Sequence, residues 1–540
     1  MSDAQEIIRL YDMAESDAMN FRRLYQDSAD LCFPRENSII TTFTTQGGER
    51  NTDIIDPTGI MAKDDMAAGL SGVLFPVGQP FHEILMVDRE LNRTESVRRY
   101  LGYLNETVHE KRAASNFRVQ ADETLRSIAA FGTGNLFSEY RPGVGLNYKD
   151  WDVGQYVIVQ NNMNRIDQVY MKIWWTASQA YAEWGDKVGE EVLKALNDDK
   201  KMMHKFEFRV AIRPRGKRNR RLSDAANMPF EKVCVNVKEK IVVEEGGYEE
   251  FPHFVSRWSH SSNETWGRGQ GVTALPVMRR LQQIYSDFLE CGEKHNNPAL
   301  QVLQDFDGTV KVKPGAVNRV PQLPSIDSVG RALGNFPITA EVLDGERQIV
   351  QKMFLNDIFM PITPLKGDRR NQLELSERIS ESMKRIGTPI SRLYEEWIKP
   401  MVIRDIFLLM RNGELPPPPP EIRGKQFKIN VLGPIAMQLK NWQAQGALKW
   451  LGYGAELKQS FPGIDDNINL DSAYRRVGES LGVSIEDMAT DDEVNAKRAE
   501  RAKQIQAEQA MRMAETAAKA YPASTKAPEA GSPAEALSGV

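Results

Sequence analysis

The sequence has few cysteines, and their positions exclude two common kinds of stabilising cross-link. Only three occur among 540 residues, Cys32, Cys234 and Cys291, and no two of them form a CxxC pair. A disulfide framework needs paired cysteines and a zinc knuckle needs closely spaced ones, so neither is expected. Scattered single thiols are typical of a protein in a reducing cytosol.

The sequence also lacks a long apolar run. The stretch VIRDIFLLM is short and flanked by charge, whereas a helix that spans a bilayer needs about 18 to 20 apolar residues. The first residues, MSDAQEIIRLYDMAESDAMNF, are acidic and broken by charge, unlike the basic and then apolar order of a signal peptide. We therefore expect neither a membrane anchor nor export.

Neither charge is in large excess. The chain has 69 Lys and Arg against 74 Asp and Glu, which gives a formal net charge of −5. Tight, static nucleic-acid binding as the whole function would require a strongly basic composition, and this is excluded. Hydrophobic residues make up 41% and charged residues 26%, which argues against wholesale disorder. The length corresponds to about three or four domains.

Catalytic and nucleotide-binding signatures are missing as well. GLSGV at 69–73 lacks the second glycine of a nucleophile elbow, and the six histidines form no HExxH pair. Two glycine clusters, FGTGN at 131–135 and GRGQG at 267–271, do not match the Walker pattern, nor does KGDRRN at 366–371. We interpret both clusters as turns that need positive φ. The sequence predicts no enzyme, cofactor or metal, and a nucleotide-dependent translocase would need the absent Walker lysine.

Hydrophobic periodicity predicts an α+β fold that is predominantly helical. Up to about residue 137 the spacing is mostly helical, with one stripe of Phe117, Ala121, Leu125 and Ile128 and a helix-compatible Asp-Pro-Thr at 56–58. Residues 131–262 contain β-branched and aromatic runs, such as QVYMKIWW, KFEFRVAI and KVCVNVKEKIVV, separated by turn signals such as GVGLNY. Two helices then enclose a Gly/Pro-rich excursion with two short β-like runs, which suggests a hairpin. A longer helix is expected over 374–411, kinked at Pro389 and Pro400.

The remaining sequence predicts a boundary, more helices and a tail. NGELPPPPPEIRG is a stiff polyproline segment. Residues 434–487 have helical spacing, and a charged helix is expected from Asp491. The Ala/Pro/Ser/Lys-rich end is expected to be disordered.

Two groups of basic residues are candidate contacts for anions. The run RVAIRPRGKRNRR at 209–221 is either a solvated hairpin, offset by the acidic EEGGYEE that follows, or a surface for anions or nucleic acid. The second group lies in the loop between two strongly helical patterns and consists of Lys366, Arg369 and Arg370. The residues of the first, the possible basic anion-contact patch, are Arg213, Arg215, Lys217, Arg218, Arg220 and Arg221.

Four stretches carry a resemblance to a known family: DPTGIMAKDDMAAGLSGVLFPVGQPFHEI, ADETLRSIAAFGTGNLFSEY, ETWGRGQGVTALPVMRRLQQI and FLNDIFMPITPLKGDRRNQLELSERISESM. With the order of elements, they resemble the portal, or head-to-tail connecting, proteins of short-tailed bacteriophages (podovirus type). The stretches fall within about residues 50–400. The resemblance implies a portal-protein fold (wing, stem, clip and crown) that assembles into a dodecameric ring around a DNA channel at one capsid vertex.

The resemblance also implies a division of the chain. Its parts are 1–271 wing, helical to about 130 and then α+β; 272–296 stem helix 1; 297–335 clip; 336–360 stem helix 2; 361–373 channel loop; 374–433 long kinked wing helix and proline-rich boundary; 434–490 crown; and 491–540 charged helix and disordered Ala/Pro-rich tail. The tail is shorter and less regular than a long helical barrel would need.

Site residues and partners follow from the same resemblance. In the channel loop, Lys366, Arg369 and Arg370 would form a limited ring of phosphate contacts. In the clip, where the motor and tail dock, the candidate docking residues are Lys311, Lys313 and Arg319. The implied partners are double-stranded DNA passing through the channel, the packaging ATPase (terminase), tail and adaptor proteins, and the major capsid and scaffolding proteins, with no membrane.

The implied location is the virion, after synthesis and assembly in the cytoplasm of the host bacterium. The alternative is a non-conducting structural adaptor, that is, an oligomeric head or collar protein. It explains the absent catalytic residues equally well but leaves the order of helix, excursion, helix and loop unexplained.

Overall fold

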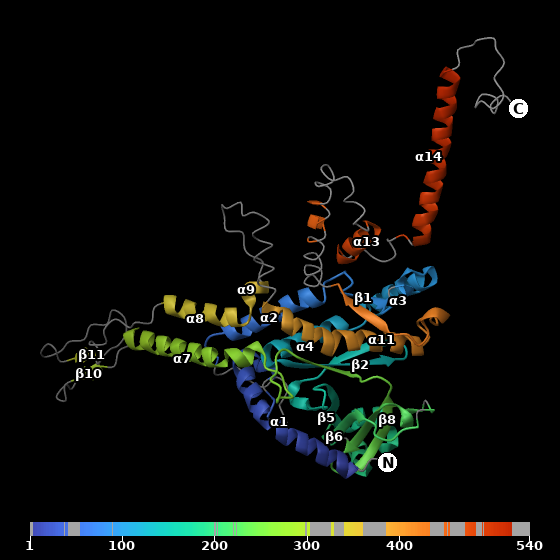
Figure 1. Ribbon diagram of the computed structural model, residues 1–540. Helices are drawn as coiled ribbons and strands as arrows, with labels where there is room; N and C mark the ends of the chain where they lie inside the picture. The colour runs from blue at the N-terminus through green and yellow to red at the C-terminus, as the bar shows by residue number, and fades with distance from the viewer. Residues whose placement is uncertain are drawn as a thin grey trace, which may run out of the picture. The chain divides into compact units, whose positions relative to one another are not determined.

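The structure is a computed structural model (Figure 1). It describes residues 4–36, 38–40, 54–88, 90–198, 201, 203–219, 221–222, 224–296, 300–302, 326–328, 340–359, 385–432, 446, 448–450, 452–453, 470–481, 489 and 491–520. The chain divides into two compact units. Unit 1 comprises residues 1–82, 107–416 and 431–438, and unit 2 comprises residues 83–106, 417–430 and 439–540.

Unit 1 combines helices with two antiparallel sheets. Its helices are α1 (Ala4–Cys32), α2 (Thr58–Leu74), α4 (Phe117–Phe131), α5 (Ala177–Trp184), α6 (Glu190–Leu196), α7 (Gln270–Asn296), α8 (Ala340–Met353), α9 (Asn356–Phe359) and α11 (Lys399–Arg411). Its strands are β2 (Thr133–Arg141), β3 (Gly145–Asp150), β4 (Tyr156–Gln160), β5 (Ile166–Thr176), β6 (Lys205–Pro214), β7 (Phe230–Asn236), β8 (Ile241–Tyr248) and β9 (His253–Arg257). The mixed, largely helical fold class is confirmed.

The larger sheet has the order β4-β5-β6-β7-β8, in which each strand pairs with the next along the chain, and the smaller has the order β3-β2-β9. Most predicted strands are confirmed, but KVCVNVKEKIVV is two strands, β7 and β8. The side chain of Asn236 accepts the backbone N–H groups of Lys238 and Glu239, and Lys240 has φ +56°. These contacts make a turn. The turn signal GVGLNY begins in the turn between β2 and β3, and β3 starts at its third residue, Gly145.

The core of unit 1 lies around α4, which packs against α2 and against β2 and β3. The side chain of Phe75 contacts three other aromatic rings, those of Phe81, Phe117 and Trp397, at centroid distances of 5.1, 5.1 and 5.3 Å. The apolar stripe predicted for α4 is buried throughout, which confirms its helical spacing; its members are Phe117, Ala121, Leu125 and Ile128.

The long helix predicted over 374–411 is described from residue 385, and it continues past Pro389 and Pro400. Between the two prolines lies a π-helical segment, Tyr394–Ile398. The N–H of Lys399 donates to the carbonyl of Tyr394, five residues earlier. The next residue, Pro400, has no N–H to donate, so widening the turn here sacrifices little backbone bonding.

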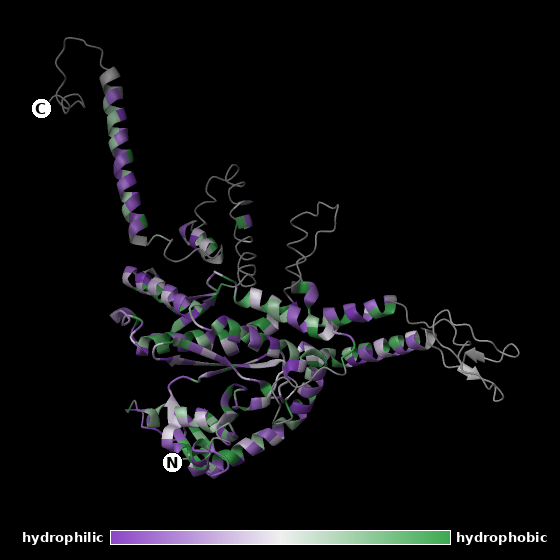
Figure 2. Ribbon diagram, turned by 180° about the vertical axis from the view of Figure 1, so that it is seen from behind, coloured by the Kyte–Doolittle hydropathy of each residue, from purple (hydrophilic) through white to green (hydrophobic). Residues whose placement is uncertain are grey.

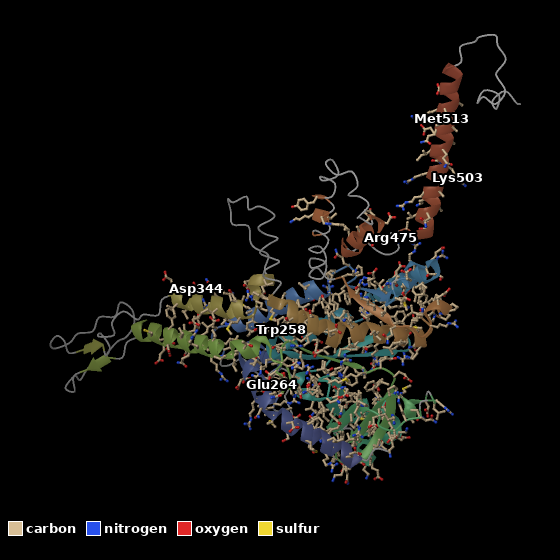
Figure 3. The ribbon with its side chains drawn as sticks, in the orientation of Figure 1. Trp258, Glu264, Asp344, Arg475, Lys503 and Met513 are labelled. Atoms are coloured by element: carbon tan, nitrogen blue, oxygen red, sulfur yellow. The ribbon has the colours of Figure 1, made fainter. Side chains whose placement is uncertain are left out.

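Unit 2 contains β1 (His82–Met86) paired with β12 (Phe427–Val431), the first part of α3 (Glu95–Ala113), α13 (Leu470–Leu481) and α14 (Asp491–Ala520). The predicted charged helix from Asp491 is confirmed as α14, and Figure 2 shows hydrophilic residues along its whole length. Side chains such as Lys503 and Met513 project from it (Figure 3). No helix among the described residues is both long and apolar enough to cross a membrane. The predicted disordered tail lies outside the described residues.

Candidate functional site

Helices α7 and α8 run side by side and form what we call the stalk (Figure 1). Between them the chain makes the predicted excursion, whose described residues, Leu300–Val302 (β10) and Ile326–Ser328 (β11), pair as antiparallel strands. This confirms the predicted order of helix, excursion with two β runs, and helix. Side chains from both helices are buried in unit 1, namely Leu275, Met278, Leu281, Leu343 and Val350.

The surface of the stalk carries balanced charge. Helix α7 has three acidic residues and three Lys or Arg, and α8 has three acidic and two basic residues. One pair links the helices, because Arg280 donates to Glu346 at 2.6 Å. Asp344 is exposed on α8 (Figure 3). Among the described cations of these helices, Arg279, Arg280 and Arg347 each form an ion pair.

The segment that precedes α2 is bound to both stalk helices. We call the side chains of Asp56, Gln282 and Arg347 the stalk clamp. From α7, Gln282 accepts the N–H groups of Ile55 and Asp56 at 2.9 and 3.0 Å and donates to the carbonyl of Asp56 at 2.7 Å. From α8, Arg347 donates to the Asp56 carboxylate at 2.8 Å. The same carboxylate accepts the N–H of Thr58 at 2.9 Å.

The clamp carboxylate is held in its charged form. Burial favours a higher pKa for Asp56, but the hydrogen bonds from Thr58 and Arg347 outweigh it and hold the pKa below its usual value. Asp56 is fully buried. The clamp therefore fixes the positions of α7 and α8 relative to α2 with a charge that stays ionised at neutral pH.

We expect Gln282→Ala to lower the free energy of unfolding by about 2 kcal/mol, because the N–H of the buried Asp56 loses its acceptor. The control is Gln283→Ala. Gln283 is exposed and donates to Asp287 within the same helix at 2.8 Å, so its loss should cost less than about 0.5 kcal/mol. Urea unfolding of both variants measures the difference, and equal losses would show that the clamp does not stabilise the stalk.

The basic patch lies on and beyond the end of β6. Arg213 donates to Glu231 and, at 3.0 Å, to Glu6. Arg215 donates to the carbonyls of Met228, Ala225 and Gly246 at 3.2, 3.3 and 3.0 Å. These two arginines are thus engaged within the chain. Three members are exposed, Lys217, Arg218 and Arg221, while Arg220 lies outside the described residues.

An open cavity of about 820 Å³ adjoins the patch. Its lining includes Arg213, Arg215 and Lys217, but also the carboxylates of Glu231 and Glu245. The acidic segment therefore does lie beside the basic one, as the solvated-hairpin interpretation requires, while the exposed cations remain accessible to an external anion. The remaining predicted site residues lie outside the described residues; they are Lys311, Lys313, Arg319, Lys366, Arg369 and Arg370.

The two glycine clusters pack against each other, and we call this contact the glycine junction. Gly132 has φ +86°, its carbonyl accepts the N–H of Trp258 at 2.9 Å, and the N–H of Gly269 donates to the carbonyl of Phe131 at 3.0 Å. A Cβ at Gly132 would lie 2.1 Å from the nitrogen of Gly269, and a Cβ at Gly267 would lie 2.0 Å from the oxygen of Gly132. Trp258, which donates to Gly132, is labelled in Figure 3.

The prediction of positive-φ turns is thus confirmed at Gly132 and wrong for GRGQG. None of Gly267, Gly269 and Gly271 has positive φ. They are glycines because another stretch of backbone approaches them too closely for a side chain. GLSGV lies inside α2 and forms no strand-to-helix turn, which agrees with its rejection as a nucleophile elbow.

An ion pair is buried in the core beside α4. One carboxylate oxygen of Asp405 accepts two hydrogen bonds from Arg112, from Nε at 3.0 Å and from Nη2 at 2.6 Å. The same oxygen accepts a third from the hydroxyl of Tyr148 at 2.8 Å. The exposed fractions of the Arg112 and Asp405 side chains are 2% and 0%. Burial alone lowers the pKa of Arg112, but Asp405 and Tyr148 outweigh it, and the pKa is raised. Burial also raises the pKa of Asp405, and the guanidinium of Arg112 and the hydroxyl of Tyr148 oppose that rise.

Three carboxyl groups meet near the start of β4, from Glu36, Asp150 and Asp152. Burial, and then the carboxylate of Asp152, raise the pKa of Glu36 to about 9. Burial is also the main reason that the pKa of Asp150 rises to about 7, although the hydroxyl of Thr124 donates to it at 2.6 Å. Glu36 is thus protonated in the folded chain at neutral pH.

This proton makes stability depend on pH. The folded state holds it up to about pH 9, while the unfolded state releases it near pH 4.5. Stability is therefore lost as the pH rises between these values. We expect Glu36→Gln to flatten the fall between about pH 7.5 and 9, where Asp150 is already ionised. The melting temperatures of the wild type, of Glu36→Gln and of the exposed control Glu110→Gln, measured across this pH range, test the prediction. If the melting temperature of Glu36→Gln falls with pH as steeply as that of the wild type, Glu36 does not hold this proton.

The described residues offer little support for metal binding or for a reactive thiol or imidazole. No group of three His, Cys, Asp or Glu residues there could hold a metal. Burial raises the pKa of the Cys32 thiol to about 11 and lowers that of His253 to about 3. Both groups are therefore neutral at pH 7 and suited to packing.

Comparison with known proteins gives one consistent result. The family model described as bacteriophage head to tail connecting protein matches residues 4–488. The portal protein of Salmonella phage epsilon15 is 24% identical over 527 residues, which cover 96% of this chain and 94% of that protein. The probable portal protein of Bordetella phage BPP-1 is 22% identical over 506 residues, which cover 92% and 91%.

Proposed function

Since the chain belongs to the bacteriophage head-to-tail connecting protein family, we propose that it forms the dodecameric portal ring at one vertex of a phage capsid. Double-stranded DNA is packaged and ejected through the centre of this ring. The observation that carries the proposal is the family match, which runs through both units of the chain. A phage portal is a structural component of the virion, with capsid, tail and packaging partners.

We assign the stalk to the stem. The excursion between its helices, residues 297–335, is the clip, on which the packaging ATPase docks first and tail proteins later. Residues 361–373 are the channel loop, and residues from about 434 form the crown toward the capsid interior. The exposed apolar side chains on the stalk support contacts between copies in a ring; they are Phe288, Leu289, Val342 and Ile349.

Charge supports a channel through which DNA slides. Twelve copies, each with a formal charge of −5, carry about −60 in total. Every phosphate that a Lys or Arg neutralises adds affinity through counterion release, so a channel lined with many such contacts would hold DNA in place. The balanced charge of α7 and α8 avoids this. Lys366, Arg369 and Arg370 then supply a limited ring of phosphate contacts.

Negative-stain microscopy of the purified chain tests the proposal. We expect class averages with twelve-fold symmetry and an opening wide enough for a DNA duplex. Monomers or unringed dimers, across a range of salt and protein concentrations, would contradict the portal. Rings without an opening would favour the non-conducting adaptor.

The role of the channel loop can be tested with two variants, each of which removes three positive charges, one variant from the loop and the other from the basic patch. In a packaging reaction, we expect the triple variant Lys366→Ala/Arg369→Ala/Arg370→Ala to form rings but to package DNA several-fold less well, because it loses phosphate contacts. The control, Lys217→Ala/Arg218→Ala/Arg221→Ala, removes the same charge from the basic patch. Equal packaging by both variants would show that the cations of the channel loop have no special role in packaging.

A further inference from the structure

Strand β1 of unit 2 forms hydrogen bonds along both of its edges. One edge pairs with another strand, and the other binds amide side chains. The paired edge faces β12. Its sequence is HEILM, and the side chains of Ile84 and Met86 are buried. An open strand edge presents unpaired backbone N–H and C=O groups with which another chain can pair.

The second edge of β1 is filled by two asparagine side chains. Asn105 accepts the N–H of Ile84 at 2.7 Å and donates to its carbonyl at 3.1 Å. Asn92 accepts the N–H of Met86 at 2.9 Å and donates to its carbonyl at 3.0 Å. Each amide thus binds both backbone groups of one residue, as a neighbouring strand would.

The asparagines are themselves held in place. Asn105 lies on α3, and its side-chain nitrogen also donates to the carbonyl of Leu101 at 2.9 Å. Asn92 lies in a short 3₁₀ helix, Leu91–Arg93, that follows β1. Both side chains are half-buried. They are therefore placed by the local fold and occupy the positions that an added strand would need.

The same arrangement recurs in unit 1, which argues against coincidence. Asn116 accepts the N–H of Tyr148 on β3 at 2.8 Å and donates to its carbonyl at 2.7 Å. Gln120 accepts the N–H of Asp150 at 2.7 Å. Strand β3 lies at the edge of its sheet. Two separate sheets thus have an edge strand bound by side-chain amides.

We propose that Asn92 and Asn105 close the edge of β1 against an extended segment of a second copy of this chain. Copies that gather in one assembly meet at high local concentration, where strand addition between them would compete with correct contacts. The two amides satisfy the backbone groups internally, so an incoming strand gains no hydrogen bonds there. The contact is autoinhibitory, and the crowding of copies that makes it necessary rests on the proposed ring assembly.

A peptide that copies β12 tests the proposal. The probe is a fluorescein-labelled peptide of residues 425–432, KQFKINVL, with a scrambled peptide as its reference. We expect no change in anisotropy with the wild-type chain and a saturable rise with Asn92→Ala/Asn105→Ala. The double variant should also self-associate in sedimentation velocity at concentrations where the wild type does not. The control is Asn197→Ala, whose amide donates only to a carbonyl of its own helical segment.

Circular dichroism establishes that the variants are folded. If the double variant fails to fold, Asn105→Asp replaces it, because the carboxylate still accepts the N–H of Ile84 but cannot donate to its carbonyl. Peptide binding by the wild type, or a folded variant that neither binds the peptide nor self-associates, would overturn the proposal. Ring formation plays no part in this readout, so its failure leaves the portal assignment untouched.

Discussion

Gly132→Ala is expected to lower the free energy of unfolding of unit 1 by at least about 4 kcal/mol, or to prevent folding altogether. Two causes combine. At φ +86° an L-residue is strained by about 1 to 2 kcal/mol. The new Cβ would also lie 2.1 Å from the nitrogen of Gly269 and 2.2 Å from the carbonyl carbon of Arg268. These are backbone atoms at the start of the stalk, so no side-chain rotation relieves the clash.

Gly143 offers a matched control, because it separates strain from close approach. Its φ is +83°, and a Cβ there would have no atom within 4 Å. We therefore expect Gly143→Ala to cost only about 1 to 2 kcal/mol. Soluble yield and urea unfolding followed by circular dichroism compare the two variants. Similar losses would mean that backbone strain alone accounts for the effect.

Asp405→Ala is expected to cost about 3 to 5 kcal/mol, since it leaves the guanidinium of Arg112 buried without its counter-charge. The hydroxyl of Tyr148 loses its acceptor at the same time. The contrast is Lys194→Ala, which breaks an exposed pair with Glu190. Such surface pairs contribute at most about 1 kcal/mol. The same urea experiment measures both losses.

A double-mutant cycle with Arg112→Ala distinguishes the ion pair from simple loss of packing. If the unpaired buried charge is the main cost, the loss in unfolding free energy of the double variant should be smaller than the sum of the two single losses. The expected difference is about 1 kcal/mol or more. Additive losses would indicate that the two side chains act independently and that their attraction is not the source of stability.

The sequence predicted the regular elements well where the signal is local. Runs such as KFEFRVAI and QVYMKIWW are rich in β-branched and aromatic residues, and both form strands. The stripe of Phe117, Leu125 and Ile128 identified α4 because buried positions on a helix recur every three or four residues. These patterns depend only on neighbouring residues, and a single sequence contains that information.

The contacts between distant segments were missed for a physical reason. Gln282 reaches the backbone of Asp56 across 226 positions, and Arg347 reaches its carboxylate across 291. No local spacing indicates such pairs. A partial signal existed, because Asp-Pro-Thr at the start of α2 is typical of a helix N-terminus, yet it did not indicate that Asp56 also binds the stalk. Strand β1 was missed because HEILM lies in the region up to residue 137, where the spacing is mostly helical.

The glycine junction also sets a delay during synthesis. Its hydrogen bond from Gly267 to Thr133 spans 134 positions, and translation proceeds at about 5 to 20 residues per second. The surface of α4 and β2 that the junction covers must therefore wait roughly 7 to 27 seconds for its partner to be made. During that interval the nascent chain exposes the apolar side chains of residues 117–141, so we expect chaperones to bind this segment early.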